Sequence, residues 1–133
     1  MSSGTLLDAS ALLALVFREP GHEQVAEALP AAISTVNLTE VVSKLRDRGV
    51  PPEEAVAIHL EAGIDVVPFG VEAALRAGLL RDLTRPYGLS LGDRCCLATA
   101  QIEGFSILTA DAAWESLAPA LGLSNANIRP RRG

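Results

Sequence analysis

Short apolar runs alternate along this chain with longer segments in which apolar residues recur at helical spacing, and this alternation restricts the possible folds more than any other feature. The runs predicted to form strands are 5–7, 31–35, 65–69, 106–109 and 126–129, and the segments predicted to form helices are 11–17, 38–49, 52–63, 71–83 and 91–104. Strands that alternate with helices of about 10–15 residues are typical of βαβ units, whose helices cover both faces of a parallel sheet. We therefore predict an α/β fold, a three-layer α/β/α sandwich around a mostly parallel sheet of four to five strands.

Length and composition indicate one globular domain over residues 1–133. Hydrophobic residues make up 49% of the chain and charged residues 20%, a balance that permits a buried core and disfavours disorder. The two cysteines, Cys95 and Cys96, are adjacent, so we expect reduced, buried thiols rather than a disulfide or a zinc site. Because no signal-peptide pattern and no apolar run near the roughly 20 residues of a membrane span is present, we expect a cytoplasmic protein without membrane contact.

An aspartate lies just past the end of two predicted strands. Asp8 comes after the run at 5–7 and Asp111 after the run at 106–109. Because the carboxyl ends of parallel strands meet at one edge of a sheet, where ligands bind, we expect both carboxylates at that edge. Glu40 follows the strand at 31–35 and Asp93 follows Ser90, each in the first turn of its predicted helix. The positions of these four acids predict one acidic site.

Helix capping is the alternative explanation for each acid. Two of the acids fit capping boxes, in the pairs Asn37–Glu40 and Ser90–Asp93, and the two aspartates that follow strands would each suit an N-cap. Acids in a first turn also favour the helix dipole. Capping does not require an acid at every junction along this edge, so the joint pattern favours a functional site while both explanations stay open for any one acid.

Crowded carboxylates favour a bound cation. They raise one another's pKa or recruit an ion that removes the repulsion. Mg²⁺ and Mn²⁺ prefer oxygen ligands, and such an ion can activate water and neutralise charge on a phosphodiester. The net charge of −5 excludes a strongly basic nucleic-acid surface, so a metal would also supply positive charge that the protein lacks.

Other catalytic arrangements fit the sequence less well. His22 and His59 lie in helical contexts away from the acids, which disfavours a His-based nuclease or a Ser-His-Asp triad. No glycine-rich phosphate-binding motif follows the first strand. Asp8 could be a phosphate-accepting nucleophile, but Ser10 rather than a second acid stands two residues later. A packed helix face explains the adjacent cysteines better than a reactive pair does.

Four segments together resemble the PIN-domain family, and more narrowly the VapC-type toxins of bacterial type II toxin–antitoxin pairs. These segments are "LLDASALLALVFREPG", "ISTVNLTEVVSKL", "GLSLGDRCCLATA" and "ILTADAAW", and the resemblance extends from Leu6 to about Ile128. The resemblance implies a PIN-like α/β/α sandwich and a Mg²⁺- or Mn²⁺-dependent endoribonuclease. The acidic quartet of the family corresponds to Asp8, Glu40, Asp93 and Asp111.

The resemblance also implies roles for these residues. Three aspartates, Asp8, Asp93 and Asp111, would be the main metal ligands, and Glu40 would bind the metal directly or through water. Hydrolysis by a metal-activated water would leave a 5′-phosphate and a 3′-hydroxyl. The residues that would orient carboxylates or water from a second layer are Ser10, Thr109 and Asn37.

The expected partners are RNA, a second copy of the chain in a homodimer, and a cognate antitoxin whose peptide tail enters the acidic groove. Arg46 or the C-terminal arginines could guide the RNA backbone, although exposed arginines are more often simply solvated. One alternative is a catalytically idle PIN-like module that binds RNA or protein, which an intact acidic quartet disfavours. Another is a DNA nuclease acting on flaps or ends, which the lack of long insertions disfavours. The sequence does not indicate which RNA is cleaved.

Overall fold

The computed structural model describes residues 4–112, 114–121 and 125–127, and within these ranges five strands form one sheet in which every pairing is parallel. The strand order is β3-β2-β1-β4-β5. The strands are β1 (Thr5–Leu7), β2 (Ala31–Ser34), β3 (Ile64–Val67), β4 (Ser106–Thr109) and β5 (Asn125–Asn127).

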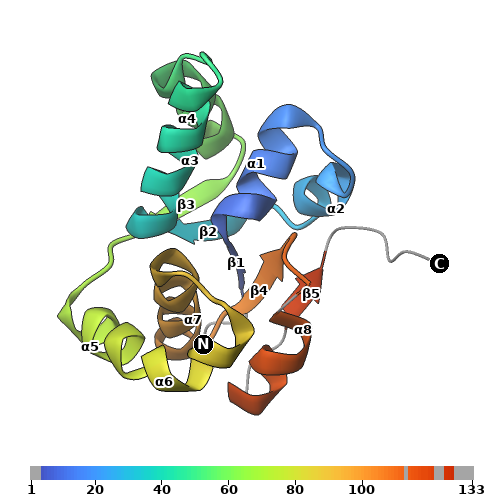
Figure 1. Cartoon of the computed structure of the whole chain (residues 1–133). Helices are drawn as coiled ribbons and strands as arrows, with labels where there is room; N and C mark the ends of the chain where they lie inside the picture. Colours follow the sequence, from blue (N-terminus) through green and yellow to red (C-terminus); the bar gives the residue numbers. More distant parts are fainter. Residues whose placement is uncertain (1–3, 113, 122–124, 128–133) are drawn as a thin grey trace.

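Helices cover both faces of this sheet, as the alternation of segments predicts (Figure 1). The helices on one face are α1 (Ala9–Phe17), α2 (His22–Glu27), α3 (Thr35–Asp47) and α4 (Pro52–Glu61). Those associated with the other face are α5 (Val71–Leu79), α6 (Arg81–Thr84), α7 (Leu91–Glu103) and α8 (Trp114–Leu117), with the 3₁₀ turns η1 (Arg85–Tyr87) and η2 (Ala118–Leu121). The predicted three-layer α/β/α sandwich is confirmed.

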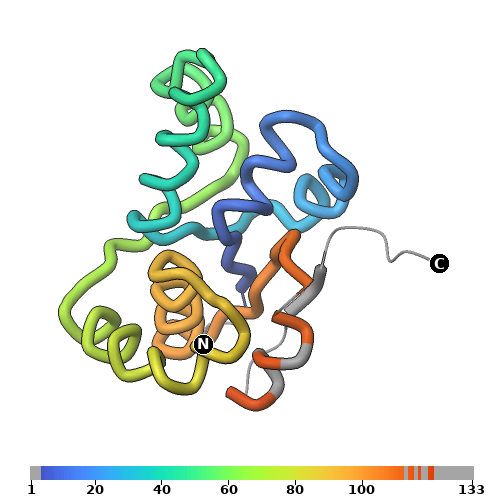
Figure 2. The backbone as a smooth tube through the Cα atoms, in the orientation of Figure 1, coloured from blue at the N-terminus to red at the C-terminus, as the bar shows by residue number. Residues whose placement is uncertain are grey.

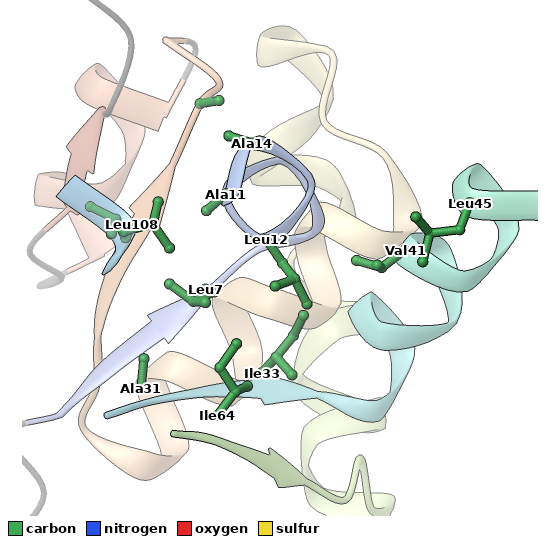
Figure 3. Close-up of a cluster of buried hydrophobic side chains, with 12 residues drawn as sticks. Leu7, Ala11, Leu12, Ala14, Ala31, Ile33, Val41, Leu45, Ile64 and Leu108 are labelled. Atoms are coloured by element: carbon green, nitrogen blue, oxygen red, sulfur yellow. The ribbon is translucent and has the colours of Figure 1, made fainter. Parts of the chain in front are cut away.

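Consecutive residues of the buried strands pack into two different cores, one on each face of the sheet. Leu7, Ile33 and Leu108 pack with α1 and α3 in the cluster that Figure 3 shows. Their neighbours Leu6, Ala32 and Ile107 pack with α7 in the second cluster, which also contains both cysteines. Side chains alternate between the two faces of a strand, and strands covered on both faces are therefore apolar throughout. This is why β1 is read in the sequence as a continuous apolar run.

The strand order reverses at β1. The chain passes from β1 to β2 and β3 on one side, then runs through α5, α6 and α7 before returning as β4 on the other side of β1, a path that can be followed in Figure 2. Leu7 lies opposite Leu108 in the register of β1 and β4, so these strands end at the same level. Open parallel sheets bind ligands at such a reversal point, in the crevice beyond the carboxyl ends of the strands.

The start of α3 differs from the prediction. Thr35 belongs to the helix rather than to the strand predicted at 31–35, and the helix predicted from residue 38 begins three residues earlier. Ser34 is the N-cap, because its hydroxyl oxygen accepts a hydrogen bond from the backbone N–H of Asn37 at 3.2 Å. The predicted capping box of Asn37 and Glu40 is therefore wrong, and Glu40 lies in the second turn of α3 rather than the first.

Other boundaries also moved for local reasons. The predicted strand 65–69 is observed as Ile64–Val67, since Pro68 has no N–H to continue the ladder. The helix predicted at 71–83 is divided at Leu80 into α5 and α6. The helices α2 and α8 were not predicted, because six and four residues are too few to show a helical period. In the run predicted at 126–129, residues 128 and 129 lie outside the described residues, and β5 is Asn125–Asn127.

The cysteines and the helix lengths bear on two expectations from composition. Cys95 and Cys96 are both free and buried, as predicted. Among the helices in the described ranges, none has the length and apolar character that crossing a membrane requires.

Candidate active site at the carboxyl edge of the sheet

Asp8 is a buried carboxylate fixed by hydrogen bonds from three directions. It is the N-cap of α1 and only 3% exposed. Its Oδ1 accepts from the backbone N–H of Ala11 at 2.9 Å and from the Ser10 hydroxyl at 2.7 Å. Its Oδ2 accepts from the Thr109 hydroxyl, at the end of the neighbouring strand β4, at 2.5 Å. The capping role predicted for Asp8 is confirmed, and it accounts for only part of these contacts.

The two hydroxyls connect Asp8 to the segment after β4. Ser10 Oγ accepts from the backbone N–H of Ala110 at 2.9 Å, and Thr109 Oγ1 accepts from the backbone N–H of Asp111 at 3.0 Å. Each hydroxyl therefore accepts from a backbone amide and donates to the carboxylate. Residues about a hundred positions apart thus set the orientation of one carboxyl group, which is the positioning that the sequence predicted for Ser10 and Thr109.

Burial raises the pKa of Asp8 to about 6 from an ordinary value of 3.8. The hydrogen bonds from Thr109, Ser10 and Ala11 act in the opposite direction because they favour the charged form, and the charge of Asp93 raises the pKa further. A carboxylate that needs three donors and still has a raised pKa is poised to gain from a nearby cation.

Glu40 is held against α7 by Asn37. The Asn37 side-chain amide donates to Glu40 Oε1 at 2.7 Å and to the backbone carbonyl of Gly92 at 3.2 Å. Asn37 is itself 1% exposed and accepts from the Ser34 hydroxyl at 3.0 Å. It therefore lies at the predicted site, where it orients the Glu40 carboxylate.

The sequence did not single out Gly92, and the structure shows why a glycine is needed there. A Cβ atom at this position would overlap the carboxylate of Glu40. Gly92 is the second residue of α7, so α3 can bring Glu40 directly against the first turn of α7. A glycine inside an otherwise helical pattern was the available signal for such a close approach.

Asp93 lies in the same turn of α7. The backbone N–H of Ser90 donates to Asp93 Oδ2 at 3.0 Å and the N–H of Asp93 donates to Ser90 Oγ at 3.2 Å, so the predicted capping box is confirmed. Burial, opposed by the Ser90 hydrogen bonds and assisted by the charge of Asp111, raises the pKa of Asp93. Capping and proximity to another acid therefore coexist at this residue.

Electrostatic coupling shows that the predicted acids share one region. The charge of Asp93 acts on Asp8 and the charge of Asp111 acts on Asp93. Burial raises the pKa of the Cys96 thiol well above its usual range, and the charges of three acids raise it further: Asp8, Asp93 and Glu40. Asp111 is exposed and follows β4, at the rim of this region. The four acids thus come from β1, α3, α7 and the end of β4, which are remote in sequence.

The donor set fits a hydrated hard cation better than a fully dehydrated one. All four side chains offer carboxylate oxygens, the ligands that Mg²⁺ and Mn²⁺ prefer. Within the described ranges, however, no three His, Cys, Asp or Glu side chains are grouped closely enough to hold a metal ion together. Mg²⁺ keeps several of its waters and usually takes only one or two protein carboxylates directly. Acids that share one region without converging on one point are compatible with that mode.

The two histidines and Arg46 lie elsewhere. His22 is on α2, where its Nε2 lies 2.9 Å from Glu23, and His59 is on α4, where its Nδ1 lies 2.7 Å from the carbonyl oxygen of Ala55. Arg46 is exposed in the last turn of α3. The C-terminal arginines, Arg129, Arg131 and Arg132, fall outside the described residues.

Both the sequence and the fold are similar to those of known proteins. The family model described as PIN domain matches residues 5–119. No curated protein matches the sequence significantly. Among solved structures, a toxin–antitoxin complex from Klebsiella pneumoniae is similar with a TM-score of 0.73 at 22% identity, over 98% of this chain and 100% of that one.

Two further structures have the same fold. VapC20 from Mycobacterium tuberculosis, a sarcin-ricin loop cleaving toxin, is similar with a TM-score of 0.75 at 19% identity, over 96% of this chain and 100% of that one. VapBC2 from Rickettsia felis, bound to a DNA fragment from its promoter, is similar with a TM-score of 0.72 at 17% identity, over 92% and 97% of the two chains.

Proposed function

The chain belongs to the PIN-domain family, and from this membership we propose that it is a metal-dependent endoribonuclease that acts as the toxin of a type II toxin–antitoxin pair. The observation that carries the proposal is the acidic region at the reversal point of the sheet. The charge of Asp93 acts on Asp8 and that of Asp111 acts on Asp93, while Glu40 acts with Asp8 and Asp93 on the Cys96 thiol. The Thr109 hydroxyl orients Asp8 and the Asn37 amide orients Glu40, and neither of these bonds is a helix-capping bond. Capping alone does not call for such positioning.

The acids of the proposed site bind the metal, and neighbouring hydroxyl and amide groups orient them. Asp8, Asp93 and Asp111 would hold Mg²⁺ or Mn²⁺, one or two of them directly and the rest through the waters of the ion, with Glu40 binding directly or through water. Ser10 and Thr109 fix the orientation of the Asp8 carboxylate, and the Asn37 amide fixes that of Glu40. When bound, the metal supplies Lewis-acid chemistry: it activates water for attack on phosphorus and neutralises charge on the phosphodiester. The expected products carry a 5′-phosphate and a 3′-hydroxyl.

The proposed partners follow from the family and from one exposed surface. Solved structures with this fold include toxin–antitoxin complexes, which supports a cognate antitoxin whose peptide tail enters the acidic groove. A homodimer is supported by an apolar stripe on α5, formed by Val71, Leu75 and Leu79, which are 77%, 66% and 85% exposed. These residues recur every four positions along one helix, so two copies related by a two-fold axis can bury the same stripe on each other. The cytoplasm is the proposed location.

Removal of one acid at a time tests the proposal. Purified protein should cleave RNA in Mg²⁺ or Mn²⁺ and lose cleavage in a chelator, and Asp8→Asn and Asp93→Asn should each abolish metal-dependent cleavage without unfolding the chain. Asp47→Asn, an exposed aspartate at the end of α3, is the matched control and should leave cleavage unchanged. Near-normal cleavage by Asp93→Asn in metal would show that the assigned mechanism is wrong.

A thermal shift in Mn²⁺ distinguishes the nuclease from a catalytically idle binding module. Binding to the folded state alone raises the melting temperature by mass action. The nuclease should show a Mn²⁺-dependent rise that Asp8→Asn reduces, whereas an idle module should show neither the rise nor cleavage.

A further inference from the structure

Three arginines line one hollow beside the acidic region. Arg81 from α6, Arg85 from η1 and Arg94 from α7 surround a space of about 410 Å³, with Leu91 also on its wall. None of the described residues that line this hollow is acidic. The chain carries a net charge of −5, but the three guanidinium groups around this concave space make it locally positive.

A hydrogen bond to the backbone of α5 fixes the position of the Arg94 side chain. Its Nη1 donates to the backbone carbonyl of Ala77, near the end of α5, at 3.0 Å. Arg94 is half-buried and lines the hollow, so its guanidinium is positioned before any ligand arrives. Because a guanidinium has five N–H donors, this single bond leaves several for a ligand. Pre-organised donors lose less conformational entropy on binding.

The other two arginines are exposed at the mouth of the hollow. Among the ion pairs between described residues, the one that involves this trio joins Arg85 to Asp82, at 3.6 Å, with both side chains largely exposed. Such an exposed pair contributes little energy and can exchange for a better partner. Phosphate is that partner, because the planar fork of arginine donors matches its oxygens.

The hollow and the acidic region share the first turn of α7. Leu91 and Arg94 line the hollow, while Gly92 and Asp93 between them face Glu40 and the capping Ser90. Because one turn of a helix rises only about 5.4 Å, a single strand of RNA can contact both features. The acids repel an RNA strand even when a divalent ion is bound, since four carboxylates outweigh two positive charges. A cationic contact next to them offsets that repulsion.

We propose that the hollow formed by Arg81, Arg85 and Arg94 binds a backbone phosphate of the RNA strand, next to the phosphate that is cleaved. This inference rests on the proposed ribonuclease function and names a substrate contact for it. Leu91, which is 63% exposed, provides an apolar surface at the edge of the hollow for the sugar or base of the same nucleotide. The contact is independent of base identity, because phosphates carry no sequence information.

RNA binding without cleavage tests the contact directly. We would titrate a fluorescein-labelled single-stranded RNA of mixed sequence with the full chain in EDTA, by fluorescence anisotropy, over a range of KCl concentrations. The double variant Arg81→Gln/Arg85→Gln should bind roughly tenfold more weakly at low salt. The slope of log K against log salt should fall by up to about 0.7, because the hollow holds one phosphate and each phosphate contact in a single strand contributes about 0.7.

A second pair of cations controls for net charge. Arg18→Gln/Lys44→Gln removes the same charge from exposed positions at the ends of α1 and α3, away from the hollow, and should change binding much less. Arg94→Lys keeps the positive charge but removes the planar guanidinium with its paired donors, so it should weaken RNA binding. Circular dichroism and the melting temperature should show that this variant is folded. Equal losses in both double variants, or none in Arg81→Gln/Arg85→Gln, would overturn the proposal. So would a loss of binding to a poly-glutamate peptide without a loss for RNA, which would make the hollow a protein-binding site.

Cleavage assays separate this inference from the proposed function. If the enzyme cleaves RNA, the double variant should raise KM and leave kcat nearly unchanged, as expected for binding that is equal in the ground and transition states. Unchanged KM with intact cleavage would refute the contact and leave the nuclease standing. If the chain cleaves no RNA in any metal but only the double variant loses RNA binding, the contact stands and the nuclease function falls.

Discussion

At Asp8, one carboxyl group serves the fold and the proposed chemistry together. It caps α1 through Ala11, and it also receives hydroxyl bonds from Ser10 and from Thr109 on the neighbouring strand. The capping explanation and the functional explanation, which the sequence left open, are therefore compatible at the same residue. The raised pKa of Asp8 supplies a way to measure the cost of keeping it charged in a buried place.

The stability of the metal-free protein should depend on pH through Asp8. Its folded pKa of about 6 lies above the ordinary 3.8, so the folded state holds a proton more tightly than the unfolded state. Stability should therefore be fully present below about pH 4 and fall as the pH rises to above 6, by about 3 kcal/mol in total. Asp8→Asn should lack this part of the slope and be more stable than the native chain at pH 7.5. Urea unfolding in EDTA at pH 4.5, 5.5 and 7.5 measures the difference, and parallel curves for the two proteins would rule the effect out.

Gly92→Ala should test the approach of Glu40 to α7. The added methyl group overlaps the Glu40 carboxylate, which lies at the end of a flexible side chain and must rotate away. The variant should therefore lose only about 1 kcal/mol of stability, chiefly through the broken Asn37–Glu40 hydrogen bond. The loss should largely disappear in a Glu40→Ala background, because the colliding group is gone. Gly78→Ala, on α5 with open space around the new methyl group, is the control and should be neutral or stabilising. A loss for Gly92→Ala that persists without the Glu40 side chain would contradict the packing described.

At the scale of elements, two helix starts deliver the acids to one region. The helix α3 is capped by Ser34 rather than by Asn37, and Asn37 instead bridges Glu40 and the backbone carbonyl of Gly92. The helix α7 is capped by Ser90, and its first turn carries both Gly92 and Asp93. The starts of these helices therefore decide which acids can interact.

Ser34→Ala should remove the N-cap of α3. The expected loss is about 1 kcal/mol, the usual contribution of a serine cap, with a further cost because the Ser34 hydroxyl also donates to buried Asn37. Ser43→Ala is the control on the same helix, where the hydroxyl only bonds the carbonyl one turn earlier, and it should be close to neutral. Chemical denaturation of the two variants side by side makes the comparison, and equal losses would place the cap elsewhere.

At the scale of the whole molecule, the strand order creates the site. The strand β1 lies between β2 and β4. After β1 the chain builds β2 and β3 on one side of it and later builds β4 and β5 on the other side. The ends of β1 and β4 then lie together, and Asp8 and Asp111 follow them. A different order of the same strands would keep every local feature and separate these two acids.

The apolar stripe on α5 should form the homodimer contact. Leu75→Glu/Leu79→Glu places charges in the stripe of Val71, Leu75 and Leu79 and should convert a dimer to a monomer in sedimentation equilibrium. Ile58→Glu adds a charge at another exposed apolar residue, on α4, and should leave the dimer intact. A native chain that sediments as a monomer at micromolar concentration, or a dimer that survives the double substitution, would argue against this contact.

Much of the fold and the positions of the acids could be predicted because they depend on local pattern. Alternating strand and helix periods indicated two covered faces, and apolar runs such as 5–7 and 106–109 were long enough to identify strands. Short elements such as α2, and boundaries such as the start of α3, could not be predicted well, because several residues near each end can serve as caps. Asn37 was placed near the site by the family resemblance, whereas the capping role that the sequence alone suggested for it belongs to Ser34.

The sequence by itself determined the layers of the fold and an acid after each of two strands, since hydrophobic periodicity and residue identity are local properties. Only the tertiary structure decided that β1 and β4 are neighbours, that Thr109 donates to Asp8, and that Gly92 makes room for Glu40. It also brought Arg81, Arg85 and Arg94 around one hollow, which no spacing in the sequence indicates. The physical reason is that these contacts depend on strand order and helix packing, and both are set by the free energy of the whole core rather than by any single segment.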